Sequence, residues 1–103
     1  MPKKLFISQP MNGLNDEQIK AERNRILEVA RKEYPGEEIE LIDSFFESAP
    51  HDAKPLWFLG KSFELLSTAD IVYFGKGWDK ARGCIMEHEA AVRYLSEAAI
   101  ITE

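Results

Sequence analysis

Short apolar runs alternate with longer segments of helical periodicity along these 103 residues, and that order leaves few folds open. The short runs are rich in Ile, Val, Leu and Phe, which is typical of strands buried on both faces of a sheet. The longer segments repeat their apolar residues with the period of an amphipathic helix. Strands are predicted at residues 3–7, 38–42, 71–74 and 98–102, and helices at residues 15–34, 55–68 and 83–95.

Strands that alternate with helices are joined by crossovers, so neighbouring strands run parallel and the helices cover both faces of the sheet. The sequence therefore predicts a three-layer α/β fold of the flavodoxin or Rossmann type. We expect the order βαβαβαβ and a parallel sheet of four strands, or five. With 45% apolar residues, the chain can bury the core of a single domain that spans residues 1–103.

Local signals mark where the first two helices begin and end. Asn15 and Gln18 have the spacing of a capping box, which predicts a helix start. The helix should stop at Tyr34, because Pro35 and Gly36 follow it. Pro55 suits the first turn of the second helix.

Composition narrows the classes of partner. Eighteen acidic and thirteen basic side chains give a net charge of −5, and no cluster of Lys or Arg is dense enough to suggest a nucleic-acid surface. No apolar run has the length of a signal peptide or membrane span. Cys84 is the single cysteine, so no disulfide can form within the chain. We therefore expect a soluble, cytoplasmic protein without nucleic-acid or membrane partners.

Residues 70–89 predict a strand, a loop that contains Gly75 and Gly77, and a helix that begins near Gly83. Ligands of open α/β sheets collect at such junctions. A helix start there places Glu87 in the first turn, where unpaired N–H groups and the helix dipole favour an ionised carboxylate. Glu87 could be a nucleophile, or a common device that stabilises a helix.

Right-handed crossovers bring the loops after all strands to one end of the sheet. The loops that begin at Ser8, Asp43 and Gly75 should therefore meet near Glu87. Asp43 and its neighbour Ser44 could contact a ligand, or could simply form a turn. Residues 47–54 could form a flap over the site or an ordinary surface loop, in which His51 would be solvated.

The sequence lacks the G-x-G-x-x-G and P-loop motifs and has no zinc-type Cys and His pairs, so we expect no cofactor and no metal. Cys84 lies where a helix start could activate a thiol, but a small buried residue is the expected role. Trp57 and Phe58 are expected to serve packing or a subunit interface rather than to stack on a cofactor.

Three segments, residues 7–13, 69–72 and 83–87, resemble the nucleoside 2-deoxyribosyltransferase-like superfamily, in particular its small bacterial and phage-type members. The segment Gly83-Cys84-Ile85-Met86-Glu87 is similar to the family's Gly-x-x-x-Glu, whose glutamate attacks the anomeric carbon of a nucleoside sugar. The resemblance implies that Glu87 is the nucleophile. It also implies that the loop after the first strand holds the sugar or a 5′-phosphate.

The implied activity is cleavage or exchange of the N-glycosidic bond of a (deoxy)nucleoside or nucleoside 5′-monophosphate, by a transferase or a hydrolase. Family members associate as homodimers or larger homo-oligomers, so we expect the same here. The residues expected to bind substrate are Ser8, Gln9, Pro10, Met11, Asn12, Gly13, Asp43, Ser44, Gly75, Gly77, Trp78, Arg82 and Gly83.

The chain departs from the family pattern in its acids. Family transferases commonly carry an acid directly before the motif glycine, where this chain has Ala81 and Arg82. They also carry an acid in the preceding helix, where this chain offers Lys61, Ser62 and Glu64. Asp79 could replace the first of these acids and protonate the leaving base, or could be a turn residue or helix cap. The arginine shifts the expected substrate from free nucleosides toward phosphorylated ones.

Two other readings stay open. One is a binding module of the same fold that keeps the pocket for a nucleotide-like ligand but lacks turnover. The other is an interaction protein that uses Trp57, Phe58 and Trp78 as a contact surface. We rank the interaction protein last, because it leaves the polar residues near the strand ends unexplained.

Overall fold

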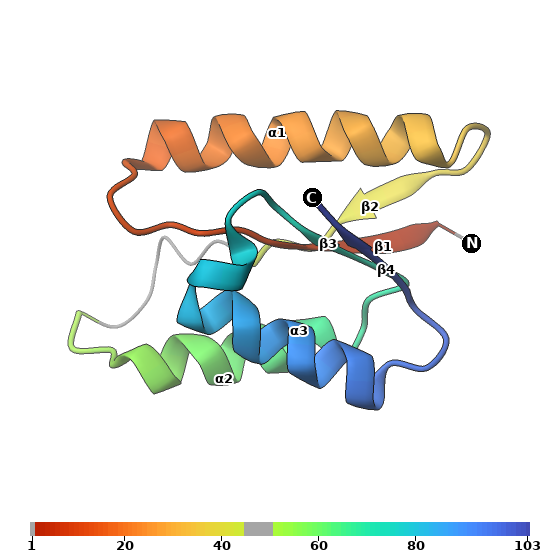
Figure 1. Ribbon diagram of the computed structural model, residues 1–103. Coiled ribbons are helices and arrows are strands. Elements are labelled where there is room, and N and C mark those ends of the chain that lie inside the picture. The colour runs from red at the N-terminus through yellow and green to blue at the C-terminus, as the bar shows by residue number, and fades with distance from the viewer. Residues whose placement is uncertain (1, 45–50) are drawn as a thin grey trace.

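The computed structural model describes residues 2–44 and 51–103 and shows strands and helices in alternation (Figure 1). A short 3-10 helix, η1, stands between the third strand and the third helix. The elements are β1 (Lys3–Ser8), α1 (Asp16–Glu33), β2 (Ile39–Leu41), α2 (Pro55–Leu66), β3 (Ile71–Phe74), η1 (Trp78–Lys80), α3 (Arg82–Tyr94) and β4 (Ala99–Thr102).

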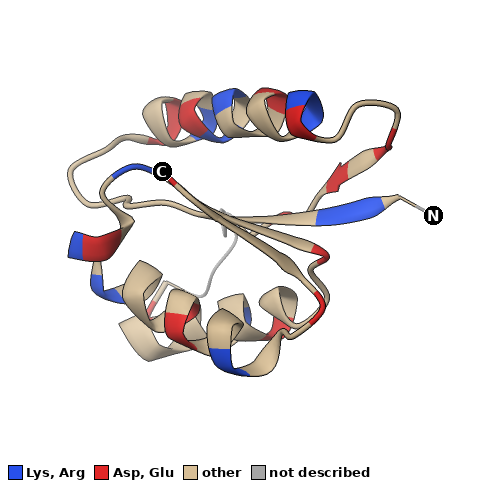
Figure 2. Ribbon diagram, turned by 45° about the vertical axis from the view of Figure 1, so that its right-hand side comes forward, with Lys and Arg blue, Asp and Glu red and all other residues tan. Residues whose placement is uncertain are grey.

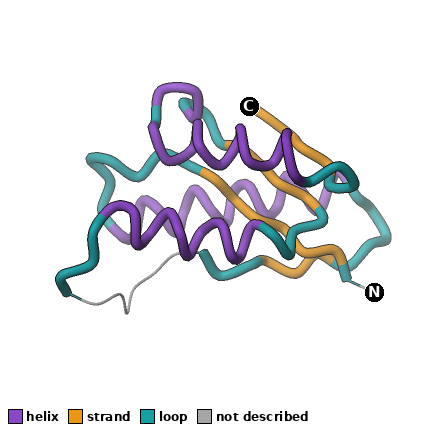
Figure 3. The backbone as a smooth tube through the Cα atoms, turned by 90° about the horizontal axis from the view of Figure 1, so that it is seen from below, coloured by secondary structure: helices purple, strands orange, loops and turns teal. Residues whose placement is uncertain are grey.

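The four strands form one sheet in the order β2-β1-β3-β4, and every pairing is parallel. Helix α1 covers one face of the sheet, and α2 and α3 lie side by side on the other (Figures 1 and 3). The predicted three-layer α/β fold with four parallel strands is therefore confirmed. The strand order reverses between β1 and β3, which makes the carboxyl ends of these two strands the expected place for a ligand.

Alternate residues of the central strands build two separate cores, because successive side chains of a strand point to opposite faces. On the α1 side, Leu5, Ile7, Ile71 and Tyr73 pack with Ile26. On the other side, a second cluster joins the sheet to α2 and α3. Its buried members are Phe6, Ile42, Leu66, Ala69, Val72, Phe74 and Ala91.

The predicted helix signals hold in the structure. Asn15 Oδ1 accepts a hydrogen bond of 2.8 Å from the Gln18 backbone N–H, and Gln18 Oε1 accepts one of 2.9 Å from the Asn15 N–H. This reciprocal pair is the capping box. Tyr34 ends α1, and Gly36 follows with φ of +83°, a backbone conformation that favours glycine.

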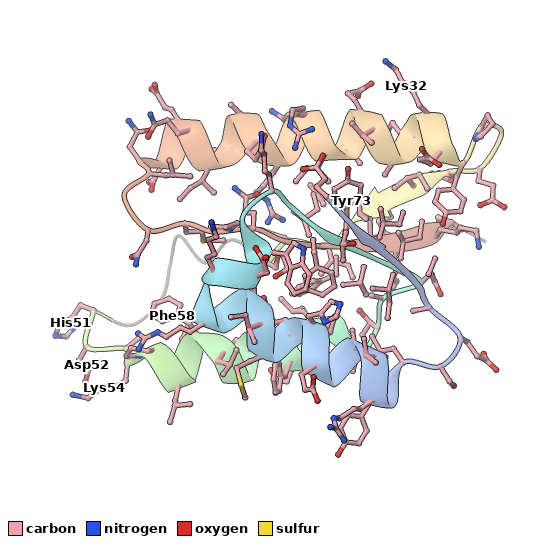
Figure 4. All side chains as sticks on the ribbon, viewed as in Figure 1. Lys32, His51, Asp52, Lys54, Phe58 and Tyr73 are labelled. Atoms are coloured by element: carbon pink, nitrogen blue, oxygen red, sulfur yellow. The ribbon has the colours of Figure 1, made fainter. Side chains whose placement is uncertain are left out.

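The Glu103 carboxylate fastens the end of β4 to the rest of the molecule. It accepts hydrogen bonds from Tyr73 Oη at 2.8 Å, from the Arg25 guanidinium at 2.6 and 3.0 Å, and from the Lys76 N–H at 3.1 Å. Figure 4 shows Tyr73 on the α1 side of the sheet. Burial and the bond to Glu103 raise the pKa of Tyr73 to about 12.

Across residues 2–44 and 51–103, no helix combines the length and the apolar character that crossing a membrane requires. The predicted flap at residues 47–54 lies partly outside the described residues. Within the described part of that segment, His51 is exposed, as expected for a loop histidine.

Candidate functional site

A cavity of about 830 Å³ opens at the carboxyl end of the sheet, next to the point where the strand order reverses. Its size falls within the range of small-molecule sites. Three segments enclose it: the loop after β1, the start of α2, and the connection from β3 into α3. The lining residues are Gln9, Pro10, Met11, Asn12, Pro55, Phe58, Leu59, Ser62, Lys76, Gly77, Lys80, Ala81, Arg82, Gly83, Cys84 and Glu87.

Glu87 lies in the wall of this cavity with only 8% of its surface exposed. Ser8 Oγ, at the end of β1, donates a hydrogen bond of 2.7 Å to Glu87 Oε1. These residues lie 79 positions apart in the chain and meet because β1 and β3 are neighbours and α3 follows β3. The expected meeting of the first-strand loop with Glu87 is therefore confirmed.

The expectation that Glu87 lies in the first turn of its helix is wrong. Helix α3 begins at Arg82, so Glu87 falls in the second turn, and the influence of the helix dipole fades beyond the first. Burial instead raises the pKa of Glu87, although hydrogen bonds to Ser8 and Ser62 act in the lowering direction. Desolvation, rather than the helix dipole, governs the charge of this carboxyl group.

Seven of the predicted binding residues do line the cavity. Gln9 is notable among them, because only 5% of its surface is exposed. Its Nε2 donates to the Ile19 carbonyl at 3.4 Å, while its Oε1 finds no hydrogen-bond partner within the described chain. The seven residues are Gln9, Pro10, Met11, Asn12, Gly77, Arg82 and Gly83.

Two of the predicted glycines serve the backbone rather than the cavity wall. Gly13 forms a turn with φ of +80°. Gly75 is buried, its N–H donates to the Ser8 carbonyl at 2.8 Å, and a Cβ there would stand 3.3 Å from Ile26 Cδ1. The absence of a side chain at position 75 lets the end of β3 approach β1 and α1 closely.

Asp43 and Ser44 are not among the lining residues. Ser44 is buried, and its Oγ accepts a hydrogen bond of 3.2 Å from Arg23 Nη1. Arg23 Nη2 donates to the Ile42 carbonyl at 3.1 Å, so this buried guanidinium ties α1 to the segment after β2. Burial lowers the pKa of Arg23, while Asp43 acts in the opposite direction. Ser44 therefore helps to hold the Arg23 guanidinium, rather than forming part of the cavity wall.

Trp78 and Asp79, on η1, also lie outside the cavity lining. The Trp78 ring stacks on His88 with centroids 4.3 Å apart and lies 5.5 Å from the Phe74 ring. Asp79 is exposed on the same short helix. The structure therefore commits the Trp78 ring to packing and does not bring Asp79 to the cavity as an acid.

Cys84 does line the cavity, yet it is almost fully buried. Burial raises the pKa of its thiol, which works against a thiolate nucleophile. The role expected for a small buried residue agrees with this environment.

Sequence reasoning missed the contribution of α2 and of two lysines. Pro55, Leu59 and Ser62 repeat at helical spacing, so they share one face of α2, and all three line the cavity. The isolated serine on an apolar helix face is the signal that could have revealed this wall. Lys76 and Lys80, in the connection after β3, line it as well.

Figure 4 shows Phe58, another lining residue, at the same end of the molecule as His51, Asp52 and Lys54. Within the two described ranges, no group of three or more His, Cys, Asp or Glu side chains is arranged to hold a metal ion.

Comparisons with protein-family models, with curated proteins and with solved structures find no match to this chain.

Proposed function

We propose that this protein cleaves or exchanges the N-glycosidic bond of a (deoxy)nucleoside or nucleoside 5′-monophosphate, with Glu87 as nucleophile. The observation that carries the proposal is a buried carboxyl group, held by Ser8 at 2.7 Å, in the wall of a cavity at the switch point of a parallel sheet. The resemblance of residues 83–87 to the Gly-x-x-x-Glu motif of nucleoside 2-deoxyribosyltransferases supports the same role.

The proposed reaction passes through a covalent glycosyl ester. An ionised Glu87 oxygen forms a bond to the anomeric carbon, and the bond from that carbon to the base nitrogen breaks. The base leaves with the electron pair of the broken bond and takes up a proton from solvent. Water or a second base then attacks the same carbon, loses a proton to solvent and releases the Glu87 carboxylate, so the configuration of the sugar is retained.

Ser8 fits this scheme as a positioning residue. Its hydroxyl donates to Glu87 Oε1 at 2.7 Å and so fixes the orientation of the carboxyl group in the cavity wall. The low-dielectric surroundings strengthen the attraction between a carboxylate and a developing oxocarbenium ion. The same surroundings oppose ionisation of the free protein, since burial raises the pKa of Glu87.

A second candidate is a binding module without turnover. It is favoured by the position of Asp79, which is exposed on η1 and does not line the cavity, so the acid expected to protonate the leaving base is not in place. Among the described lining residues, Glu87 is the one that carries a carboxyl group, so the lining offers no second carboxyl group to act as the acid. The two candidates differ in whether base is released, so product formation separates them.

The test is incubation of the purified protein with nucleosides and their 5′-monophosphates, with and without an acceptor base, followed by chromatography for free or exchanged base. Nicotinamide mononucleotide belongs in this panel, because its pyridinium base leaves without needing a proton. We expect base release that Glu87→Gln abolishes and that Glu89→Gln, an exposed neighbour on α3, leaves intact.

Full turnover by Glu87→Gln would refute the assignment of Glu87 as the nucleophile. Ligand-induced melting shifts without any product would favour the binding module.

Self-association is a further part of the proposal. Large apolar side chains remain exposed on the two helices that cover the same face of the sheet, and a second copy could bury them. We expect a homodimer or larger assembly in sedimentation experiments. The exposed residues are Leu56, Phe58, Ile85, Met86, Val92 and Tyr94.

A cytoplasmic location is also proposed, because a chain with a single cysteine has no need of an oxidising compartment.

A further inference from the structure

Three cationic side chains gather along one wall of the cavity. Lys76, Lys80 and Arg82 all line it, and all come from the connection between β3 and the start of α3. Figure 2 shows basic segments at this end of the molecule, with one acidic position on η1. Such a gathering stands out in a chain whose net charge is −5.

These cations are available to a ligand. Each of the three residues is exposed, and none of their side chains forms an ion pair with a carboxylate in residues 2–44 or 51–103. Other surface cations of the molecule are paired within the chain, such as Arg31 with Glu28 and Arg93 with Glu89. The acidic neighbour Asp79 lies on η1 and does not line the cavity.

A second observation points to a ligand at the same place. Gln9 has only 5% of its surface exposed, and it lines the cavity on the side of the loop after β1. Its Oε1 atom has no hydrogen-bond partner in the described chain. A buried acceptor without a donor is costly, and a hydroxyl or amino group of a bound ligand would satisfy it after a small movement of the side chain.

We propose that Lys76, Lys80 and Arg82 form a phosphate subsite, which makes the protein select phosphorylated nucleosides over free ones. This inference rests on the proposed function, since it places the phosphate at the cationic wall and the sugar between Glu87 and Gln9. Arg82 supplies a planar fork that matches phosphate oxygens, and the lysines supply point charges. Backbone N–H groups at the start of α3, beside Arg82, add to the attraction for an anion.

The experiment is a calorimetric titration with matched probes: inorganic phosphate, nucleosides, their 5′-monophosphates, and the pair nicotinamide riboside and nicotinamide mononucleotide. The proteins are the wild type, the triple variant Lys76→Gln/Lys80→Gln/Arg82→Gln, and Lys32→Gln as a matched control. Figure 4 shows Lys32 near the end of α1, at the opposite end of the molecule from Phe58, which lines the cavity. Circular dichroism verifies that each variant is folded.

We expect at least one monophosphate to bind about tenfold or more tightly than its nucleoside, because phosphate contacts by Lys and Arg are charge-assisted. The triple variant should lose that ratio while nucleoside binding stays unchanged, and Lys32→Gln should behave as wild type. Raising the salt concentration should weaken monophosphate binding in the wild type and in Lys32→Gln, but not in the triple variant.

Three results would each overturn the subsite: equal binding of every monophosphate and its nucleoside, persistence of the ratio in the triple variant, or no binding of any phosphate-bearing probe. The proposed function fails separately, when monophosphates bind as expected but no base is released. Conversely, base release from nucleosides and monophosphates at equal efficiency would retain the reaction and refute the subsite.

Discussion

Replacing Glu87 by glutamine should make the protein more stable at neutral pH while it removes the proposed nucleophile. The substitution keeps the size and shape of a side chain that is only 8% exposed, and it removes the charge. Taking an ionised carboxylate out of water costs several kcal/mol, of which a hydrogen bond such as that from Ser8 returns about 1.5–3 kcal/mol. A neutral amide incurs a smaller desolvation cost and can still accept a bond from the Ser8 hydroxyl.

The expected gain in the free energy of unfolding is about 1–2 kcal/mol above the pKa of Glu87. For a domain near this size, each kcal/mol raises Tm by about 4–8 °C. The gain depends on pH, because burial raises the pKa of Glu87 in the folded protein. Below the pKa that Glu87 has in the unfolded chain, the group is protonated in both states and the wild type has its full stability. That stability is lost as the pH rises through the pKa that Glu87 has in the folded protein. The two proteins should therefore have similar stability in acid and diverge as the pH rises.

The assay is urea unfolding of the wild type, Glu87→Gln and Glu89→Gln between about pH 4 and pH 8, a range that starts near the usual glutamate pKa. Glu89 is exposed on the same helix and pairs with Arg93 at the surface, so its substitution should change stability by no more than about 0.5 kcal/mol. A Glu87→Gln variant that is less stable than wild type at pH 8, or a difference that does not vary with pH, would refute the reasoning that desolvation dominates at this carboxyl group.

Three further outcomes are expected. Ser8→Ala removes the hydrogen bond that lowers the pKa of Glu87, so the acid limb of the pH–rate profile should move to higher pH; an unmoved limb would show that another group sets it. Asn15→Ala removes the capping box and should cost about 1 kcal/mol in urea unfolding, whereas Asn24→Ala on the exposed middle of α1 should not destabilise. Glu103→Gln should lower the free energy of unfolding by up to about 1 kcal/mol, since its charge is shared by several donors but screened by solvent; a neutral result would mean that backbone pairing with β3 and packing suffice to hold the end of β4.

The order of strands and helices could be predicted from the sequence because it depends on local patterns. The apolar runs and the capping signal at Asn15 are short-range features, and the structure reproduces them with shifts of a residue or two at the ends. The parallel sheet then follows from the crossovers between strands. The cavity at the strand ends, with Gln9 and Arg82 in its wall, follows from the same rule.

The surroundings of individual side chains could not be predicted, because they depend on which distant segments meet. Burial of Glu87, and hence the direction of its pKa, comes from α2 and β1 closing around α3. Ser44 was expected near a ligand but meets the guanidinium of Arg23, and Trp78 was expected in the site but stacks on His88. In each case a polar or aromatic residue at a strand end had two plausible neighbours, and the packing of the helices on the sheet selected one of them.

The amino-acid sequence by itself therefore determined the alternating elements, the parallel sheet and the end of that sheet where a site can form, since periodicity and chain connectivity act locally. Only the tertiary structure decided the strand order β2-β1-β3-β4, the hydrogen bond between Ser8 and Glu87, and the wall that α2 adds to the cavity. These features arise from contacts between residues far apart in the chain, and their charge states follow from the water that packing excludes.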